Sequence, residues 1–478
     1  MKKRCVMALG IIISWLVLVS LFQMLKPLSP GINYTGEARE VSADKARFLY
    51  DLTYERGNTR VREQHIFDRV FSYIQGAKRY ILIDMFLFNS NLTSSDLPFR
   101  GISGELVEQL IDAKEREPKL NIDVITDPIN IIYGGVDSPE IEKLKRHGIN
   151  VVITDLKPLR DSNPIYSCIW RTFIQWFGNS PGGWFPNPFS INGPRVSLRS
   201  YLEMLNFKAN HRKIFMADSD GSYVSIIMSA NPHDASSSHS NVALEIRGDI
   251  AQDIYDTEKG VASFSGMRLA HFDMGRDNDK DQGLRAQVFT ENAIRKAILE
   301  EVEATVPGDN INIAMFYLSE RKIIKALIDA ANRGVDIRII LDPNKDAFGY
   351  KKIGVPNRQV AREILNKTGG KIRVRWYDTR GEQFHSKMVF IEGSGRSVII
   401  LGSANLTRRN LCNYNLELDA LVQGIGHEPI FAEAGHYYDR IWSNQDGIFT
   451  VDYDVYRDDS FIKTVICRIQ ERLGLSSF

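Results

Sequence analysis

The chain has 478 residues, of which 43% are hydrophobic and 25% are charged, and its formal net charge is +1. This length and composition are typical of a globular protein with more than one domain and large cores. The near-zero net charge gives no compositional argument for a nucleic-acid partner, although it does not exclude a local basic cleft.

The N-terminus begins with the basic stretch MKKR and continues with 21 uncharged residues from Cys5 to Leu25. A helix of that length reaches about 31 Å, the thickness of the hydrocarbon core of a bilayer. The run is longer than the apolar region of a signal peptide and has no clear small-x-small cleavage site, so we expect an uncleaved, single-pass anchor over residues 1–30 in the cell membrane. Only Lys26 follows the run closely, so the positive-inside rule predicts a cytoplasmic N-terminus and a remaining chain on the outer face.

The rest of the chain consists of two similar halves. RYILIDMFLFN (79–89) resembles NINIAMFYLS (310–319), and both have the length and composition of buried strands. In each half an amphipathic helix follows, then a strand that ends in Asp-Pro, then a further strand. The strand–helix–strand order predicts parallel pairing and an α/β fold in each half.

Specific residues mark these predicted elements. The apolar face of the first helix is formed by Leu106, Val107, Leu110 and Ile111, and that of the second by Ile323, Ile324, Leu327, Ile328 and Ala331. Gly334 suits the C-terminal cap of the second helix. The Asp-Pro strands end at Asp127 and Asp342, and the strands after them end at Asp155 and Asp378.

The first half carries an insertion of about 41 residues, mostly between Asp155 and Arg199, and the predicted insertion covers about 156–199. Apolar and aromatic residues repeat there at helical spacing, namely Tyr166, Ile169, Trp170, Phe173, Ile174 and Phe177, and the insertion contains Trp170, Trp176 and Trp184. This pattern fits a helix packed on the core. It also fits an amphipathic segment in the membrane interface, where Trp and Phe are favoured. The charged, turn-rich stretch from Gly275 to Gly283 is a candidate linker between the halves.

The same polar motif occurs once in each half, with the second copy 174 residues after the first. The first copy has His211 and Lys213, followed by Ser229 and Asn231; the second has His385 and Lys387, followed by Ser403 and Asn405. The same offset relates Asn241 to Asn415. A repeat in such register is hard to obtain by chance, so we predict a functional pair of motifs and not two histidines buried for packing alone.

The residue types in this motif suit the binding of a phosphate group. His and Lys two residues apart on a strand point the same way, and a β-hairpin would bring the Ser-Ala-Asn turn beside them. Two halves about a pseudo-twofold axis would then surround one pocket with two His, two Lys and two Asn. Ammonium and amide groups are hydrogen-bond donors, and several convergent donors stabilise the nonbridging oxygens of a phosphoryl group.

This constellation resembles the phospholipase D superfamily, whose signature is HxKxxxxD followed by GSxN, twice per pocket. The resemblance covers about residues 60–442 and is most like the bacterial cardiolipin synthase and phospholipase D-like branch. It implies an α/β fold in which two similar lobes, each a central β-sheet flanked by helices, are related by a pseudo-twofold axis. With the anchor in front, we expect a first lobe over 31–274 and a second over 284–478.

The resemblance also implies a mechanism. One histidine would attack phosphorus to form a phosphohistidine, while the other would protonate the leaving alkoxide and then deprotonate the incoming water or alcohol. By family analogy, His211 is the nucleophile and His385 the acid–base, an assignment that the symmetry of the motifs alone does not make. The phosphoryl oxygens would be held by Lys213, Lys387, Asn231 and Asn405. No metal is required.

The motif departs from the family pattern in several places. Its acid is Asp218 in the first copy and Glu392 in the second, and each is expected to point away from its histidine and to be structural. Met228 stands where the pattern has glycine, and Gly402 keeps that glycine. Glu417 is a candidate partner for a histidine ring nitrogen. Its ungapped counterpart is Ala243, so the first half lacks this acid. Glu245 or His239 could take its place.

Four cysteines are scattered along the chain without a CxxC pair, and they indicate neither a disulfide framework nor a zinc site. They are Cys5, Cys168, Cys412 and Cys467.

Three functions are compatible with these patterns. The leading one is a membrane-anchored phosphodiesterase that acts on glycerophospholipids, by phosphatidyl transfer to an alcohol such as phosphatidylglycerol or glycerol, or by hydrolysis. The second is a membrane-anchored nuclease, for which Arg195, Arg199, Arg408 and Arg409 are the best basic candidates. The third is a degenerate member that only binds lipid or protein, and the intact motifs argue against it. We expect no nucleic-acid partner and no obligate protein partner.

Overall fold

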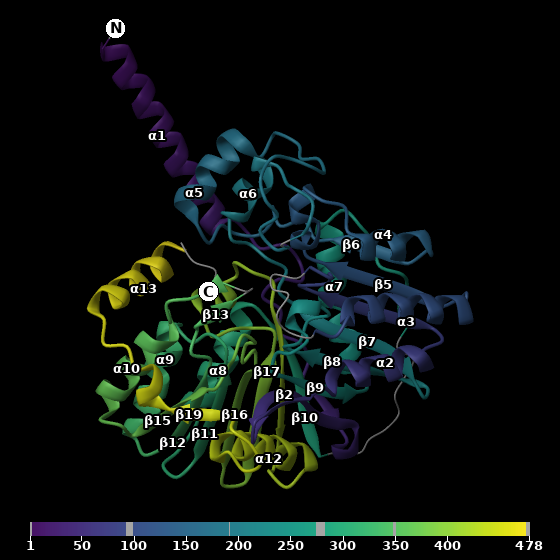
Figure 1. Cartoon of the computed structure of the whole chain (residues 1–478), viewed down its shortest axis with the longest axis vertical. Coiled ribbons are helices and arrows are strands. Elements are labelled where there is room, and N and C mark those ends of the chain that lie inside the picture. The colour runs from purple at the N-terminus through teal and green to yellow at the C-terminus, as the bar shows by residue number, and fades with distance from the viewer. Residues whose placement is uncertain (1, 92–98, 191, 274–282, 348–349, 475–478) are drawn as a thin grey trace.

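The structure is a computed structural model that describes residues 2–91, 99–190, 192–273, 283–347 and 350–474. Two sheets form the centre of the molecule, one from each half of the chain, and helices flank both of them (Figure 1). The predicted α/β class with two similar lobes is therefore confirmed. The candidate linker lies outside the described residues, apart from its final Gly283.

The first sheet has eight strands in the order β3-β2-β9-β8-β7-β4-β5-β6. The neighbours β4, β5 and β6 run parallel, as the strand–helix–strand order predicts, and the other pairs are antiparallel. The strands are β2 (Ala46–Arg56), β3 (Thr59–Glu63), β4 (Tyr80–Met85), β5 (Asn121–Thr126), β6 (Asn150–Ile153), β7 (Lys213–Ser219), β8 (Ser222–Met228) and β9 (Asn241–Arg247).

The second sheet repeats this order over nine strands, β1-β10-β18-β17-β16-β11-β12-β15-β19. Its first strand, β1, comes from the segment before the first sheet and pairs with β10, so the N-terminal segment crosses to the second lobe. The lobe boundaries stay a prediction. The strands are β1 (Arg39–Val41), β10 (Leu284–Thr290), β11 (Asn310–Met315), β12 (Asp336–Leu341), β15 (Ile372–Tyr377), β16 (Lys387–Gly393), β17 (Arg396–Gly402), β18 (Leu418–Gly424) and β19 (Thr450–Asp452).

Helices cover the sheets with the apolar faces that the sequence predicts. In α3 and α9 the predicted core residues are buried, except that Ile328 is partly buried against the core. Gly334 follows the C-cap of α9 with a φ of +99°, which glycine adopts without strain. The long helices are α2 (Ile66–Gly76), α3 (Ile102–Arg116), α4 (Pro139–Arg146), α7 (Ile250–Phe264), α8 (Asn292–Glu303), α9 (Arg321–Asn332), α10 (Asn357–Thr368), α12 (Pro429–Ser443) and α13 (Phe461–Leu473).

The remaining elements are short. They are the one-turn helix α11 (Arg408–Leu411), the two-stranded ribbon β13 (Asp346–Ala347) and β14 (Tyr350–Lys351), and the turns η1 (Ala43–Lys45), η2 (Pro128–Gly134), η4 (Asp234–Ser236) and η5 (Tyr453–Tyr456).

A hydrophobic core joins the two lobes. One continuous cluster of buried side chains contains Phe48 and Leu52 from the first sheet together with Val288 and Val422 from the second. Helix α12 of the second half also packs against β2 of the first. Because burial of apolar surface is the main force that holds such layers together, the two lobes form one unit, and the face between them is fixed.

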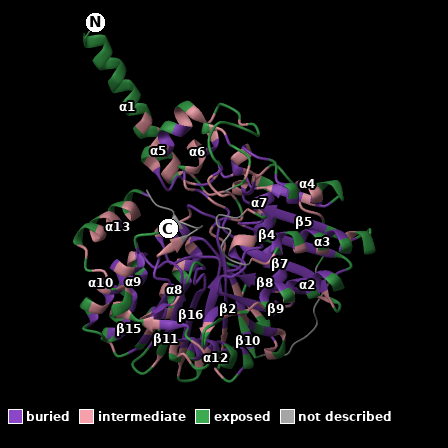
Figure 2. Cartoon of the chain, viewed as in Figure 1, coloured by how far each residue is buried: buried purple, intermediate pink, exposed green. Residues whose placement is uncertain are grey.

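The apolar N-terminal run forms α1 (Lys2–Leu25), which projects from the body with its side chains exposed (Figures 1 and 2). Among the described residues it is the one helix that is long and apolar enough to cross a membrane by length and composition. Its C-terminal end rests on the insertion, which contains α5 (Pro164–Ile169), the π-helical turn η3 (Trp170–Ile174) and α6 (Leu198–Met204).

The insertion divides its aromatic residues between the core and the surface. Trp170 is 4% exposed, and the guanidinium of Arg199 lies 3.8 Å from the centre of its ring, so this tryptophan packs on the protein. Trp176 and Trp184 are 75% and 89% exposed. The core interpretation is therefore right for Trp170, whereas the outer tryptophans leave the membrane-interface interpretation open.

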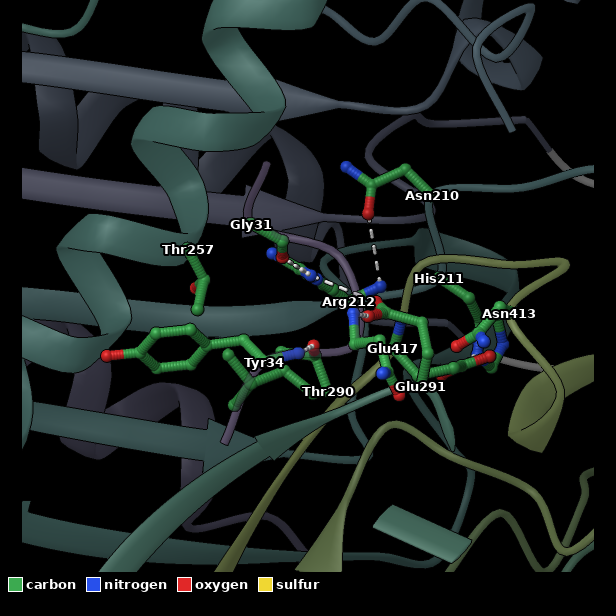
Figure 3. Close-up of polar contacts among 12 residues, drawn as sticks. Gly31, Tyr34, Asn210, His211, Arg212, Thr257, Thr290, Glu291, Asn413 and Glu417 are labelled. Carbon is green, nitrogen blue, oxygen red and sulfur yellow. Dashed lines mark hydrogen bonds and ion pairs between the residues drawn. The ribbon is translucent and has the colours of Figure 1, made fainter. Parts of the chain in front are cut away.

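Arg212, between the first histidine and lysine, is fully buried and ties three segments together (Figure 3). Its guanidinium lies 2.9 Å from a carboxylate oxygen of Glu258 on α7 and 2.9 Å from one of Glu291, which follows β10 of the second sheet. Glu291 also accepts the backbone N–H of Glu417 at 3.0 Å. One buried cation thus links two buried carboxylates from different lobes.

Replacement of Arg212 by methionine should lower the free energy of unfolding by about 3–5 kcal/mol, because two carboxylates would remain buried without a cation. Chemical denaturation of the detergent-solubilised protein measures this loss. The matched control is Arg373→Met, which removes a half-exposed pair with Asp336 and should cost less than about 1 kcal/mol. Equal losses in the two variants would contradict the role given to Arg212.

Candidate functional site

The two histidine–lysine pairs occupy equivalent places at the start of β7 and β16. The sequence predicts that each histidine lies within its strand. The strands begin at Lys213 and Lys387, so each histidine lies just before its strand instead. His211 and His385 are 9% and 7% exposed, and both lysines are fully buried. The hairpins β7–β8 and β16–β17 form as predicted. The Ser-Ala-Asn turns follow the second strand of each hairpin, at the end where the first strand begins after its histidine.

Each histidine is held by the main chain of the opposite lobe. The backbone N–H of His211 donates to the carbonyl oxygen of Leu416 at 2.9 Å, and that of His385 donates to the carbonyl oxygen of Ser240 at 2.9 Å. Because each half supplies the acceptor for the other, the two histidines are positioned only when the lobes are joined.

The ring nitrogens also contact side chains of the opposite lobe. Nδ1 of His211 lies 2.9 Å from a carboxylate oxygen of Glu417, and Nδ1 of His385 lies 3.2 Å from Oδ1 of Asn241. Both partners are acceptors, so Nδ1 carries the proton and Nε2 is unprotonated in each neutral ring. The serines support these partners, since Ser403 donates to Glu417 at 2.5 Å and Ser229 donates to Asn241 at 3.1 Å.

The expectation that Glu245 or His239 replaces a missing acid is wrong. Glu245 binds the guanidinium of Arg69 and the hydroxyl of Tyr73 and so turns away from the histidines. The ring of His239 lies 5.7 Å from that of His385, centre to centre, but Asn241 takes the hydrogen bond.

The sheet register shows why the counterpart of Glu417 is Asn241. Met228 pairs with Ala243 in the first sheet and Gly402 pairs with Asp419 in the second. The offset of 174 therefore holds through β8 and β17 but changes to 176 at β9 and β18, because the loop between them is two residues longer in the second half. The predicted match of Asn241 with Asn415 is wrong, and Asn415 instead accepts the backbone N–H of Ala209.

The same register explains the departure from the glycine pattern. A Cβ at Gly402 would lie 2.3 Å from the carbonyl oxygen of Leu418 and 2.5 Å from a carboxylate oxygen of Asp419. Met228 pairs with the small Ala243, and both are buried in one core cluster. The glycine at 402 thus avoids a clash with both the backbone of Leu418 and the side chain of Asp419.

The lysines lie directly behind the histidines. Nζ of Lys213 donates to the carbonyl oxygen of His211 at 2.6 Å, and Nζ of Lys387 donates to that of His385 at 2.8 Å. Burial lowers the pKa of Lys213 to about 7 and that of Lys387 well below 10.5. Each ammonium also faces an aromatic ring, that of Phe86 or Phe316.

Two aspartates fix the chain immediately before the histidines. The carboxylate of Asp127 accepts the backbone N–H of Asn210 at 2.6 Å, and that of Asp342 accepts the backbone N–H of Phe384 at 2.9 Å. Both residues end predicted strands, but the sequence predicts no role for them in the site. Their signal is the Asp-Pro that ends the second strand of each half.

The asparagines of the two Ser-Ala-Asn turns are buried near the histidines. Oδ1 of Asn231 accepts the backbone N–H of Leu87 at 3.3 Å, whereas Oδ1 of Asn405 is buried without a hydrogen-bond partner. An amide carbonyl oxygen only accepts, so the groups of these asparagines that suit an oxyanion are the Nδ2 donors.

The motif acids lie at the far ends of the strands. Asp218 accepts the backbone N–H groups of Arg79 and Tyr80 at 2.8 and 2.9 Å, and Glu392 accepts a bond from the Asn312 side chain at 3.0 Å. Asp218 thus fixes the start of β4, and Glu392 binds a side chain within β11, which agrees with the structural role expected for them.

Charges in each half of the site shift the pKa values of groups in the other half. Burial, followed by the charges of Lys213 and Lys387, lowers the pKa of His211 well below 6.5, and burial with Lys387 does the same for His385. Burial raises the pKa of Glu417 to about 7 and that of Asp419 to about 8. Neutral rings, buried amines and amide donors together suit a bound oxyanion, which would favour the protonated amines and rings. Among the residues that the structure describes, no group of three or more His, Cys, Asp or Glu is arranged to hold a metal.

Comparison with known proteins gives a match in the second half of the chain. Residues 301–442 match the family model described as "Cardiolipin synthase, PLD-like domain". Cardiolipin synthase A of Cronobacter sakazakii is 29% identical over 150 residues, and that of Yersinia pseudotuberculosis is 28% identical over 150 residues. Each match covers 31% of this chain and 28% of the relative, so the chain spans about a quarter of the length of these curated relatives.

A solved structure covers nearly the whole fold. The crystal structure of phosphatidylserine synthase from Haemophilus influenzae superposes with a TM-score of 0.60 over 92% of this chain and 95% of that protein, at 11% identity. At this identity the likeness concerns the fold. Together with the family match, it confirms the resemblance to the phospholipase D superfamily that the paired motifs predict.

Asp127 offers a test of the buried site through its pH dependence. Burial raises its pKa from 3.8 to about 7, so its contribution to folding is fully present below pH 3.8 and is lost as the pH rises through 7. Asp127→Asn should therefore flatten the fall in stability between these pH values. Thermal unfolding of both proteins as a function of pH measures the slope, and parallel profiles would contradict the raised pKa.

Proposed function

We propose that the chain is a membrane-anchored phosphodiesterase that acts on glycerophospholipids, a proposal supported by the match of residues 301–442 to the family model of a PLD-like domain. The observation that carries this proposal is the reciprocal pair of buried His–Lys–Asn sets, each completed by the opposite lobe. The catalytic residues in this proposal are His211, Lys213, Asn231, His385, Lys387 and Asn405. The residues that position them are Ser229, Ser403 and Glu417, with Asp218 and Glu392 as scaffold.

The first step is the attack of the unprotonated Nε2 of His211 on phosphorus. A bond forms between this nitrogen and phosphorus, and the bond from phosphorus to the headgroup oxygen breaks. His385 gives a proton to the leaving oxygen, so the headgroup departs as a neutral alcohol. The bound phosphodiester supplies the negative charge that raises the pKa of His385 enough for it to hold this proton.

The second step regenerates the enzyme. His385, now neutral, takes a proton from a water molecule or an alcohol, whose oxygen attacks the phosphohistidine and releases His211. Water gives hydrolysis, and phosphatidylglycerol or glycerol as the alcohol gives phosphatidyl transfer. Throughout both steps, Lys213, Lys387 and the two asparagines offer donors to the nonbridging oxygens.

The different partners of the two rings support this assignment. Phosphorylation of a neutral His211 leaves a positive ring, and Glu417 is a carboxylate placed at its Nδ1. His385 has an amide there, which fixes the tautomer but adds no negative charge. A ring that must gain and lose a proton is served by a neutral partner, because a carboxylate would hold the proton more strongly.

The lipid substrate is supported by the cardiolipin synthase relatives and by the apolar α1. In this proposal α1 spans the cell membrane, the N-terminus is cytoplasmic, and the catalytic lobes lie on the outer face. The balance of basic residues on the two sides of α1 supports that orientation.

The substrate class can be tested with the purified full chain in mixed micelles that contain phosphatidylglycerol, phosphatidylcholine or single-stranded DNA. Lipid turnover is expected, with loss to background in His211→Ala and a loss of about 10²–10⁴-fold in His385→Ala. Cleavage of DNA without lipid turnover would contradict the proposal and favour a nuclease.

The roles of the two histidines can be separated with a soluble phosphodiester that releases p-nitrophenolate. This leaving group departs without protonation, so His385→Ala should still release about one equivalent per enzyme in a burst, followed by slow turnover. His211→Ala should give no burst. Rapid-mixing absorbance measures both, and a burst in His211→Ala alone would reverse the assignment.

A further inference from the structure

Helix α13 (Phe461–Leu473) near the C-terminus carries an apolar stripe that the described part of the chain leaves exposed. Phe461 and Ile462 are 75% and 71% exposed. The stripe continues at intervals of four residues through Val465, Ile469 and Leu473, all of which are also exposed, so these side chains lie on one face of the helix. Cys467, on the other face, is buried, which shows that the helix rests on the protein by its opposite side.

The end of this helix lies against the insertion. A Cβ at Gly474, the C-cap of α13, would meet the carbonyl oxygen of Ser162 at 1.8 Å, so the two backbones are in close contact. Only a residue without a side chain permits this approach, and the φ of Gly474, +66°, also favours glycine.

The base of α1 is fixed to the same part of the insertion. The backbone N–H of Asp161 donates to Gln23, Nζ of Lys26 donates to Lys157 at 3.0 Å, and the guanidinium of Arg160 donates to Lys26 at 2.9 Å. Figure 1 shows α1, α5 and α13 on the same side of the molecule. The point where α1 leaves the protein is therefore flanked by the insertion, which adjoins α13.

The insertion adds exposed apolar side chains around α1, namely Ile165, Ile169, Phe173, Trp176 and Phe177. These side chains and the stripe on α13 belong to two segments that meet where Gly474 approaches Ser162. Monomeric soluble proteins rarely leave so many large apolar residues on one side without a partner.

Positive charge lies beside α13. A cavity of about 570 Å³ beside α13 is lined by four arginines and two glutamates, Arg321, Arg408, Arg468, Arg472, Glu320 and Glu471. Glu363 pairs with Arg321 and Arg468. Within the described ranges, no carboxylate forms an ion pair with Arg408 or Arg472, although Arg408 donates to the hydroxyl of Tyr414 at 2.9 Å and to the carbonyl oxygen of Arg472 at 3.5 Å. Both guanidinium groups line the cavity, where an outside anion can reach them.

We infer that α13 lies in the membrane surface beside α1, with its apolar stripe at the acyl-chain boundary and Arg408 and Arg472 at the headgroups of anionic phospholipids. This inference rests on the part of the proposed function that places α1 in a bilayer. An interfacial helix of this kind binds through apolar burial and attraction to anionic lipid. Because the base of α1 is fixed to the insertion, a second, flat attachment through α13 would set the tilt of the lobes against the lipid surface.

The test uses the full chain in proteoliposomes, with its four native cysteines replaced by alanine and an environment-sensitive fluorophore on Ile469→Cys. In vesicles that contain phosphatidylglycerol, the emission should shift to shorter wavelength and be quenched by brominated acyl chains. The matched control carries the label on Glu115→Cys, an exposed position on α3, and should show neither effect. Val465→Cys serves as a second position on the stripe if the first variant does not fold.

The arginines are tested in the same labelled protein. Arg408→Gln combined with Arg472→Gln should reduce the blue shift in phosphatidylglycerol vesicles to the value seen in pure phosphatidylcholine. A label at Ile469 that behaves like the control would overturn the inference. A blue shift without quenching by lipid, accompanied by energy transfer between labelled chains, would also overturn it and indicate a contact between two copies.

The measurement is independent of catalysis. The fluorescence result stands even if no lipid is turned over, so failure of the proposed function and failure of this inference are distinguished. Where turnover occurs, Ile469→Asp should lower activity on vesicles and leave hydrolysis of a soluble diester unchanged. An equal loss on both substrates would mean that α13 serves the fold of the second lobe and not lipid contact.

Discussion

The exchange of hydrogen bonds between the two lobes is the constraint on which the candidate site depends. Each histidine donates its backbone N–H to a carbonyl of the opposite half and its Nδ1 proton to the side chain of the residue that follows that carbonyl. Neither lobe can therefore hold its own histidine in place. The shared hydrophobic core and the buried Arg212 between Glu258 and Glu291 keep the lobes in the one arrangement that satisfies these bonds.

Within this symmetric frame the two halves differ at a few positions, and the differences are linked. A loop that is two residues longer in the second half brings Glu417 to the place that Asn241 has in the first. The same shift sets Asp419 beside Gly402 and Ala243 beside Met228. The pseudo-symmetric pocket thus contains one ring with a carboxylate and one with an amide, and two chemically distinct histidines follow from a single change in loop length.

The parts outside the repeat gather on one side of the molecule. The insertion in the first half, the projecting α1 and the last helix of the second half come from three separate regions of the sequence, and their contacts join at Ser162, Asp161 and Lys26. The repeated sheets hold the polar site, while these additions present the exposed apolar side chains. The division suggests that the repeat serves the chemistry of the site and the additions serve its placement at a surface.

The sequence by itself determined the two α/β halves, the helix faces, the apolar N-terminal helix and the paired His–Lys and Ser-Ala-Asn motifs, because strand and helix periodicity and an ungapped repeat are local properties of the chain. A structural role for Asp218 and Glu392 was also predicted from the sequence, since a residue seven positions after a histidine along a strand faces away from it. The partners of the histidine rings were not predictable, because the ungapped offset matched Asn241 to Asn415 and not to Glu417. The sequence also predicted no role in the site for Asp127 and Asp342. Only the tertiary structure decided these points, because the register of β9 and β18 and the contact between lobes are set by packing of segments more than a hundred residues apart, which no local pattern encodes.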